Sequence, residues 1–162
     1  MTFHTTYRSP KFFICVHVTH NNEIQFESAV NRHTFYTYVT YGKGIYCCFD
    51  GKNAETFEFL EEKKLFDLRK YTKSSIVGTN YIDSEIISFN PWRIEENWDG
   101  KLLDKDIKIV KSDKDYACLV CFEGNFNING KDVPKLSYVN LIKGKEYPIE
   151  IRDSYVGMFE LL

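Results

Sequence analysis

The chain has 162 residues, a formal net charge of −2 and 43% hydrophobic residues, a size that can bury a core without disulfides or metals. Its lysines and acidic residues are interspersed rather than gathered on one basic face, so we expect no nucleic-acid partner. No apolar run reaches the roughly 18 residues of a membrane span, so we expect no membrane segment.

Strand-like segments open the chain. Residues 12–18 form an apolar run of strand length, residues 23–30 alternate between apolar and polar side chains, and residues 33–41 are rich in β-branched and aromatic side chains. Asp50-Gly51 lies between two further strand-like runs and predicts a type I′ hairpin, because both central residues of that turn need a positive φ. Residues 61–64 fit either a hairpin tip or the middle of a short helix, and both alternatives stay open.

A tryptophan-containing segment divides the chain into halves. Residues 91–106 contain both tryptophans, and we expect a long loop there that joins halves at about 1–90 and 107–162. We interpret the halves as parts of one β-barrel domain, 1–162. The polar first residues have no signal-peptide core, and the five cysteines, an odd number, lie inside strand-like segments. These features favour a reducing, cytoplasmic setting in a bacterium or in an infected host.

The second half has the clearest strand pattern. Residues 116–122 are apolar on both faces, as in an interior strand, and residues 147–152 alternate between a buried and a wet face. Asn129-Gly130 predicts a second two-residue hairpin. The whole chain holds roughly ten to twelve short strands. We therefore expect an all-β fold, a barrel or jelly-roll sandwich with short helical or loop insertions.

One series of segments in the second half follows the order of a known family. A core strand ends at Glu123-Gly124, and residues 125–128, the Asn129-Gly130 turn and a later strand entry at Lys143-Gly144-Lys145 follow it. This pattern covers about residues 107–162 and resembles the cupins, a superfamily of double-stranded β-helix barrels. The resemblance implies a cupin-like barrel or jelly-roll sandwich for the chain.

The metal ligands of that family have no counterpart here. Metal-dependent cupins carry two closely spaced histidines and a carboxylate on one strand and a third histidine on a later strand. The histidines of this chain all precede the half that resembles a cupin: His4, His17, His20 and His33. Cys118 and Cys121 have C-x-x-C spacing, but the apolar residues between them favour a continuous strand, which sends the two sulfurs to opposite faces. We therefore expect no metal and no other cofactor.

Hydroxyl-bearing side chains share one face of the strand predicted at 33–41. Thr34, Tyr36 and Tyr38 lie on that face, and His33 precedes them. Such a face at a barrel mouth would hydrogen-bond a small polar ligand such as a sugar or a nucleotide. The alternative is an amphipathic outer face on which the tyrosines are half-wet packing residues.

Trp92, Arg93 and Trp98 lie within the predicted loop. Tryptophan and arginine are over-represented at binding hot spots, so we expect a contact with a partner protein or with a second copy of the chain. The alternative is that tryptophan anchors the loop in the core. Few alanines and many lysines, asparagines and isoleucines are typical of an AT-rich genome, such as that of a phage.

Two functions remain after these steps. The first is a non-catalytic cupin-like barrel that acts by partner binding or self-association, as an accessory or structural phage protein does. The alternative is a metal-independent enzyme or sensor that binds a small polar ligand inside the barrel. No nucleophile–base motif, P-loop or dinucleotide-binding fingerprint occurs, which favours the first function over an enzyme.

Overall fold

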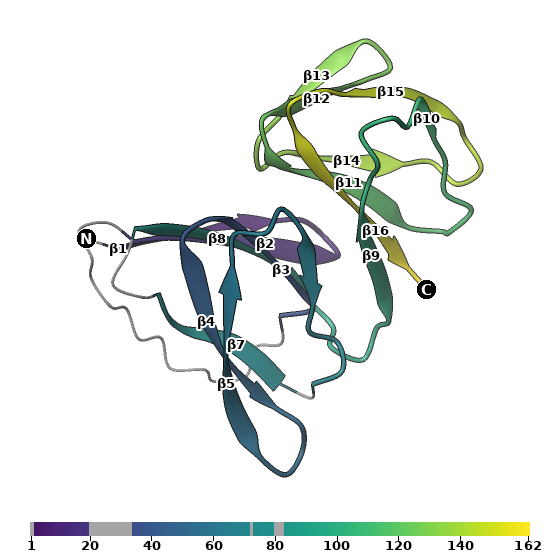
Figure 1. The fold of residues 1–162 in the computed structure, drawn as a ribbon. Helices are drawn as coiled ribbons and strands as arrows, with labels where there is room; N and C mark the ends of the chain where they lie inside the picture. The colour runs from purple at the N-terminus through teal and green to yellow at the C-terminus, as the bar shows by residue number, and fades with distance from the viewer. Residues whose placement is uncertain (1, 20–33, 72, 80–82) are drawn as a thin grey trace. The chain divides into compact units, whose positions relative to one another are not determined.

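The computed structural model describes residues 2–19, 34–71, 73–79 and 83–162, and within these ranges it contains strands, turns and loops but no helix. Accordingly, none of the described segments is a helix long and apolar enough to cross a membrane. Contacts divide the chain into two compact units, unit 1 (Met1–Ile94) and unit 2 (Glu95–Leu162). Each unit has its own sheets (Figure 1). Whether the units form a single domain, 1–162, stays a prediction.

Unit 1 is built from two antiparallel sheets. Its described strands are β1 (Thr2–Arg8), β2 (Phe12–Thr19), β3 (Tyr36–Tyr41), β4 (Lys43–Phe49), β5 (Ala54–Leu60), β6 (Leu65–Asp67), β7 (Lys73–Thr79) and β8 (Ser84–Pro91). One sheet has the order β1-β2-β8-β3-β6, and the other has the order β5-β4-β7. The strands β5 and β6 are therefore edge strands, one in each sheet.

The core of unit 1 combines residues from both sheets. Val39 on β3 and Ile86 on β8 are cross-strand partners, and they cluster with Tyr46, Cys48 and Leu68, all of them at most 1% exposed. Successive side chains of a strand point to opposite faces. The face of β3 and β8 that carries Val39 and Ile86 is therefore the interior face of this unit.

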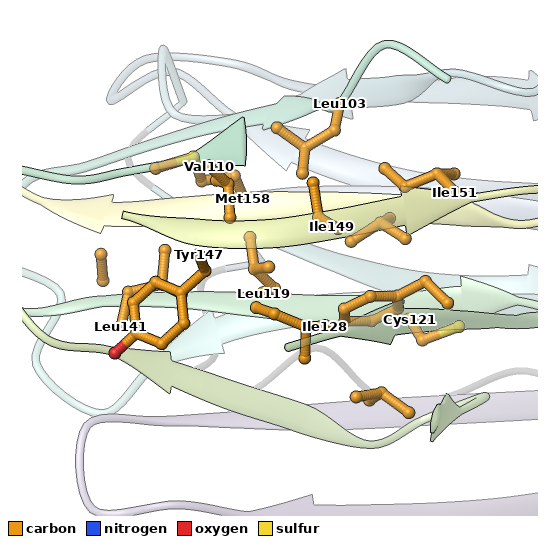
Figure 2. Packing of buried hydrophobic residues seen from close by; sticks show 14 residues of the cluster. Leu103, Val110, Leu119, Cys121, Ile128, Leu141, Tyr147, Ile149, Ile151 and Met158 are labelled. Carbon is orange, nitrogen blue, oxygen red and sulfur yellow. The ribbon is translucent and has the colours of Figure 1, made fainter. Parts of the chain in front are cut away.

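Unit 2 has the same two-sheet construction. Its strands are β9 (Trp98–Leu102), β10 (Ile109–Val110), β11 (Ala117–Glu123), β12 (Asn125–Ile128), β13 (Lys131–Pro134), β14 (Tyr138–Leu141), β15 (Tyr147–Ile151) and β16 (Tyr155–Leu161). The sheet orders are β10-β15-β12-β13 and β14-β11-β16-β9. Figure 2 shows the side chains that fill this unit, among them Leu119, Ile128, Ile149 and Met158. The cluster is apolar apart from the tyrosine hydroxyl and the cysteine sulfur that it contains.

The two units share a backbone irregularity at the same point of the fold. In unit 1, the register of β3 against β8 shifts between Val39 and Tyr41. In unit 2, the register of β11 against β16 shifts between Cys121 and Glu123. In both units a glycine with positive φ follows directly, and the next strand begins after it.

These glycines, Gly42 and Gly124, have φ values of 75° and 70°. A Cβ atom on Gly42 would lie 2.3 Å from the carbonyl oxygen of Asp83, and one on Gly124 would lie 2.5 Å from that of Asp153. Both positions therefore require glycine, for the backbone conformation and for the close approach of a second chain segment. This match aligns the two units residue by residue.

The two predicted hairpins differ in outcome. Asn129 and Gly130 have φ values of 51° and 82° between the paired residues Ile128 and Lys131, which confirms the predicted two-residue hairpin. The prediction of a type I′ turn at Asp50-Gly51 is wrong. That loop has four residues, since Phe49 pairs with Ala54, and the Asp50 carboxylate accepts hydrogen bonds from the amides of Lys52 and Asn53 at 2.8 and 2.9 Å.

Two segments between the predicted strands also differ from expectation. Residues 61–64 form neither a helix nor a hairpin tip, because they connect β5 to β6, which belongs to the other sheet. Residues 98–102, which the sequence places in a long loop, form β9 and pair with β16. Trp98 at the start of β9 is 0% exposed, so burial of an aromatic side chain stabilises an extended segment there. The predicted strand at 23–30 lies outside the described residues.

Candidate functional site

A pocket of about 350 Å³ lies in unit 1 along the edge strands β5 and β6, and we name it the seam pocket. Four aromatic side chains line it: Phe57 and Phe59 from β5, Phe66 from β6 and Tyr71 from the turn that follows β6. All four rings are partly exposed and pack against the core cluster of unit 1. Among the described strands, β5 and β6 each have one hydrogen-bonded neighbour, so the pocket lies at an edge of both sheets.

The aromatic side chains form two ring pairs. Phe59 and Phe66 have ring centroids 4.7 Å apart, and Phe57 and Tyr71 have centroids 5.7 Å apart. Phe59 also lies 5.6 Å from the buried ring of Tyr46, in an edge-to-face arrangement. The pocket walls therefore continue directly into the core, which gives the rings defined positions.

The turn after β6 is held by a charged hydrogen-bonded fork. The Asp67 carboxylate accepts a hydrogen bond from the Arg69 amide at 2.9 Å, and it accepts two more from the Arg69 guanidinium, at 3.0 Å from Nε and 2.7 Å from Nη2. Burial alone would raise the pKa of Asp67, but the hydrogen bonds from Arg69 outweigh burial and lower it. The Leu68 amide also donates to the carbonyl of Phe35 at 2.8 Å. The fork fixes the backbone that carries Tyr71.

Two lysines lie at the pocket. The Nζ atom of Lys64 is 4.7 Å from the centroid of the Phe66 ring, and the Nζ atom of Lys70 is 5.1 Å from the centroid of the Tyr71 ring. Each ammonium therefore faces one ring of a different pair, at cation–π distance. With Asp67 paired to Arg69, the lining carries a positive charge balance.

Buried polar side chains of unit 1 form two hydrogen-bonded groups, which we name together the polar network. The hydroxyls of Thr37 and Tyr46 are 2.8 Å apart and buried. The Asn90 amide donates to Ser88 Oγ at 3.0 Å and accepts from Thr34 Oγ1 at 3.0 Å. Thr37 is the cross-strand partner of both Ser88 and Phe66, so the network adjoins the seam pocket.

The interior of unit 1 is polar where the interior of unit 2 is apolar. Aligned on the two glycines and on the strand registers, the interior positions of unit 1 and their counterparts in unit 2 are Thr37 and Leu119, Ser88 and Met158, Tyr46 and Ile128, and His17 and Leu103. The four residues of unit 2 belong to its apolar core cluster. Burying hydroxyl and imidazole groups stabilises a fold less than burying hydrocarbon does, so the polar set indicates a role other than filling the core.

The predicted ligand face lies on the other side of β3. Tyr36 and Tyr38 are 1% and 0% exposed and alternate with the interior residues Thr37 and Val39. Tyr36 contacts Phe89 at 6.4 Å between ring centroids. Both tyrosines are thus fully buried packing residues rather than the half-wet outer residues of the alternative, and the predicted ligand-binding role stays a prediction.

Two further members of that predicted site have different outcomes. Thr34 is buried, and its hydroxyl donates to Asn90 as described above, so it belongs to the polar network. His33 lies outside the described residues. The structure therefore brings Thr34 close to the candidate site but does not place the whole predicted group there.

The predicted partner-binding residues differ in their burial. Trp92 is 45% exposed, its indole Nε1 donates to the Ser9 carbonyl at 2.7 Å, and its ring lies 4.5 Å from that of Phe13. Arg93 is exposed. Trp98 is fully buried and meets Tyr116 edge-to-face at 5.7 Å, which favours the alternative that it anchors the core. Their roles in partner binding stay predictions.

The described residues do not fit a metal ion. No three or more of their His, Cys, Asp and Glu side chains gather as a ligand set. Burial raises the pKa of Cys118, and burial raises that of Cys121 to about 11, so both remain protonated thiols at neutral pH, whereas metal ligation needs thiolates. His20 and His33 lie outside the described residues, and the expectation of no metal stays a prediction.

Sequence patterns alone do not reveal the seam pocket. Phe57 and Phe59 stand out in the sequence as alternating aromatic residues. Phe66 and Tyr71 follow residues 61–64, for which the sequence fits either a hairpin tip or a short helix. A usable signal is a lysine one or two residues before an aromatic residue, as in Lys64 with Phe66 and Lys70 with Tyr71. That pattern by itself does not show that β5 and β6 lie together.

Solved structures of other proteins have a similar fold. No protein-family model and no curated protein matches the chain. Among solved structures, a cupin 2 conserved barrel domain protein from Leptotrichia buccalis is 12% identical, with 100% of this chain and 89% of that chain covered and a TM-score of 0.52. The bacterial pirin YhhW from Escherichia coli, in complex with nickel(II), is 14% identical, with 99% and 90% covered and a TM-score of 0.58.

A variant of Bacillus subtilis oxalate decarboxylase is 8% identical, with 99% of this chain and 72% of that chain covered and a TM-score of 0.58. At sequence identities this low, the similarity supports a shared fold but does not support a shared activity or ligand. The expected resemblance over the second half thus extends to the whole chain, since the aligned regions cover nearly all of it. The chain has a cupin-like, all-β jelly-roll fold.

Proposed function

We propose that the protein binds a small ligand with a flat aromatic or apolar body in the seam pocket of unit 1, as a non-catalytic binding protein or sensor. The observation that carries this proposal is the set of four partly exposed aromatic rings around a pocket of about 350 Å³. Ligand sites are typically concave, about 300–1,000 Å³ in volume, and lined by apolar and aromatic side chains with a few polar groups.

Contacts that position the lining residues in the closed form support binding. The Asp67–Arg69 fork holds one wall, and the Tyr46–Phe59 ring contact holds the other. A ligand that enters such a site does not have to order its walls, which lowers the entropic cost of binding. The Asp67 carboxylate is hydrogen-bonded to Arg69 and so is poorly suited to act as a general base. We therefore propose that the pocket binds a ligand without catalysing its reaction.

The test compares neighbouring residues of β5. Phe59 points into the pocket, whereas Leu60, the next residue, is 50% exposed and points to the opposite face. We expect naphthalenemethanol, a neutral flat probe, to shift the amide NMR signals of β5 and β6. Phe59→Ala should weaken this binding about tenfold, since a stacked ring contributes about 1 kcal/mol or more. Leu60→Ala should leave it unchanged.

Two results would count against the proposal. One is an unchanged spectrum at millimolar probe. The other is equal weakening by Phe59→Ala and Leu60→Ala, which would show that the probe adheres to β5 without entering the pocket. Thermal unfolding of both variants controls for loss of structure.

A separate observation favours association as a second function. Trp92 and Ile94 are 45% and 58% exposed, and large apolar side chains at a surface are common in protein–protein contacts. The Trp92 ring also faces the Arg8 guanidinium at 5.8 Å. Self-association or binding to a partner protein, as in an accessory phage protein, therefore stays a hypothesis beside ligand binding. Sedimentation of the purified protein and of Trp92→Ala tests its self-association branch.

A further inference from the structure

We infer that the ligand of the seam pocket is a flat anion of the aryl carboxylate class, and that Lys64 and Lys70 hold its acidic group. This inference rests on the proposed function and narrows it to one chemical class. It follows from where the positive charges lie relative to the rings.

Positive charges lie over both ring pairs of the pocket. Each ring pair of the pocket has one ammonium over one of its members, Lys64 over Phe66 and Lys70 over Tyr71. Both lysines are exposed, and Lys64 also contacts Glu62 at 3.5 Å across two side chains that are each more than half exposed. An exposed ion pair of that length is weak and does not fix the ammonium.

The charge layout disfavours a cationic ligand. Clusters of aromatic rings attract organic cations, and a nearby carboxylate strengthens such a site. Here the faces of Phe66 and Tyr71 already carry ammonium groups, and the Asp67 carboxylate is bound by the Arg69 guanidinium. An incoming cation would meet two like charges and no available carboxylate in the lining.

An anionic ligand can compensate for the lysine contacts that it displaces. A flat ligand that stacks on Phe66 or Tyr71 must displace the ammonium from that ring. A lysine ammonium sits on a flexible four-carbon chain with three donors, so it can turn from the ring to a carboxylate at the rim. On the ring that it covers, the ligand would therefore replace the cation–π contact by a ring stack, and the released ammonium would form a charge-assisted hydrogen bond with the ligand. A neutral ligand would lose the first contact without gaining the second.

The experiment uses three probes of one shape and different charge: naphthoate, naphthalenemethanol and naphthylmethylammonium. Calorimetric titration at low ionic strength should give the tightest binding for naphthoate and the weakest for the ammonium. Raising the salt concentration should weaken naphthoate binding and leave the alcohol nearly unchanged, since screening acts on exposed charges. The side-chain NMR signals of the two lysines should move as the ammonium groups leave the ring faces.

Variants locate the charge effect. Lys64→Gln with Lys70→Gln should weaken naphthoate binding about tenfold, which is the size expected for two exposed charge contacts. The same change should leave alcohol binding unchanged or up to about twofold tighter, because the alcohol no longer has to displace an ammonium. Lys52→Gln is the matched control, because Lys52 is an exposed lysine of the loop between β4 and β5 and does not line the pocket. It should leave both affinities unchanged.

The outcomes separate the inference from the proposed function. Equal affinity for naphthoate and the alcohol, or tightest binding of the ammonium, would overturn the anionic ligand while ligand binding itself stands. An equal effect of Lys52→Gln would overturn the role of the two pocket lysines. If none of the three probes binds, the proposed function fails, and the inference fails with it.

Discussion

The two units of the chain have matched backbones and different interiors. In each, a strand shifts register and ends at a glycine pressed against an Asp-Ser segment, Gly42 in unit 1 and Gly124 in unit 2. Unit 2 then fills its interior with hydrocarbon (Figure 2). At the same positions unit 1 has hydroxyl and imidazole side chains, and its edge strands leave a pocket lined by aromatic rings.

We interpret this difference as a division of roles between the two units. A well-packed apolar interior stabilises a small unit most effectively, and unit 2 follows that rule. A polar interior gives up part of that stabilisation, as functional sites commonly do. Unit 1 is therefore the unit in which a ligand site is expected, and the following predictions test this contrast, from the largest effect to the smallest.

The largest effect should come from the two tryptophans, one in each unit. Trp98→Ala should destabilise the protein by about 4 kcal/mol, because it removes a fully buried ring. Trp92→Ala should cost about 1 kcal/mol or less, because that ring is 45% exposed. Urea unfolding measures both values. Similar costs for the two variants would contradict the placement of Trp98 in the core.

The two glycines should behave alike if the units share one backbone design. Gly42→Ala and Gly124→Ala should each cost about 3 kcal/mol, from a positive φ and from the clash of Cβ with a backbone oxygen. Gly130→Ala is the control, since it has a positive φ of 82° but no atom within 4 Å of the added Cβ. It should cost about 1 kcal/mol. A small effect at only one of the paired glycines would break the match.

Exchanging an interior residue sharpens the contrast between polar and apolar cores. Leu119→Thr in unit 2 should cost about 3 kcal/mol, because it buries a hydroxyl in an apolar cluster and removes volume. Thr37→Val in unit 1 keeps the shape but leaves the Tyr46 hydroxyl without its 2.8 Å partner, at about 1–2 kcal/mol. If Thr37→Val stabilises the protein, the hydroxyl pair is a site feature that stability does not need.

The smallest effect concerns the pH dependence of the Asp67–Arg69 fork. The pKa of Asp67 is lowered from its ordinary value of 3.8, so this group adds stability above that value and loses it as the pH falls through the lower folded-state pKa. The carboxylate is 47% exposed, so the contribution should stay below about 1 kcal/mol. Between neutral pH and pH about 3 the native protein should lose more stability than Asp67→Asn does. Parallel losses would show that the fork contributes nothing.

Local sequence signals predicted parts of this fold well. The Asn129-Gly130 turn and the strand at residues 116–122 depend on neighbouring residues only, and both were found. The turn at Asp50-Gly51 was predicted too short, because its length depends on the pairing of Phe49 with Ala54 across two strands. Interior position is likewise a matter of register: one residue decides whether Tyr36 or Thr37 faces the core.

The candidate site could not be predicted from the sequence, because it too depends on how distant strands are arranged. Its rings come from β5 and β6, which belong to different sheets and are not paired with each other. The periodicity of one segment shows which side chains share a face of that strand, but it does not show which other strand lies opposite. The loop at 61–64 is short enough to suit a helix, a hairpin or a change of sheet.

The short strand β6 gives the seam pocket a measurable dynamic property. It has three residues, and β3 is its one partner among the described strands, so its amides should exchange with solvent through local opening, at a free energy well below that of global unfolding. A ligand bound to the closed form would slow that exchange in proportion to its occupancy. Hydrogen exchange at Leu65, Phe66 and Asp67 would then report ligand binding without a label or an assay of activity.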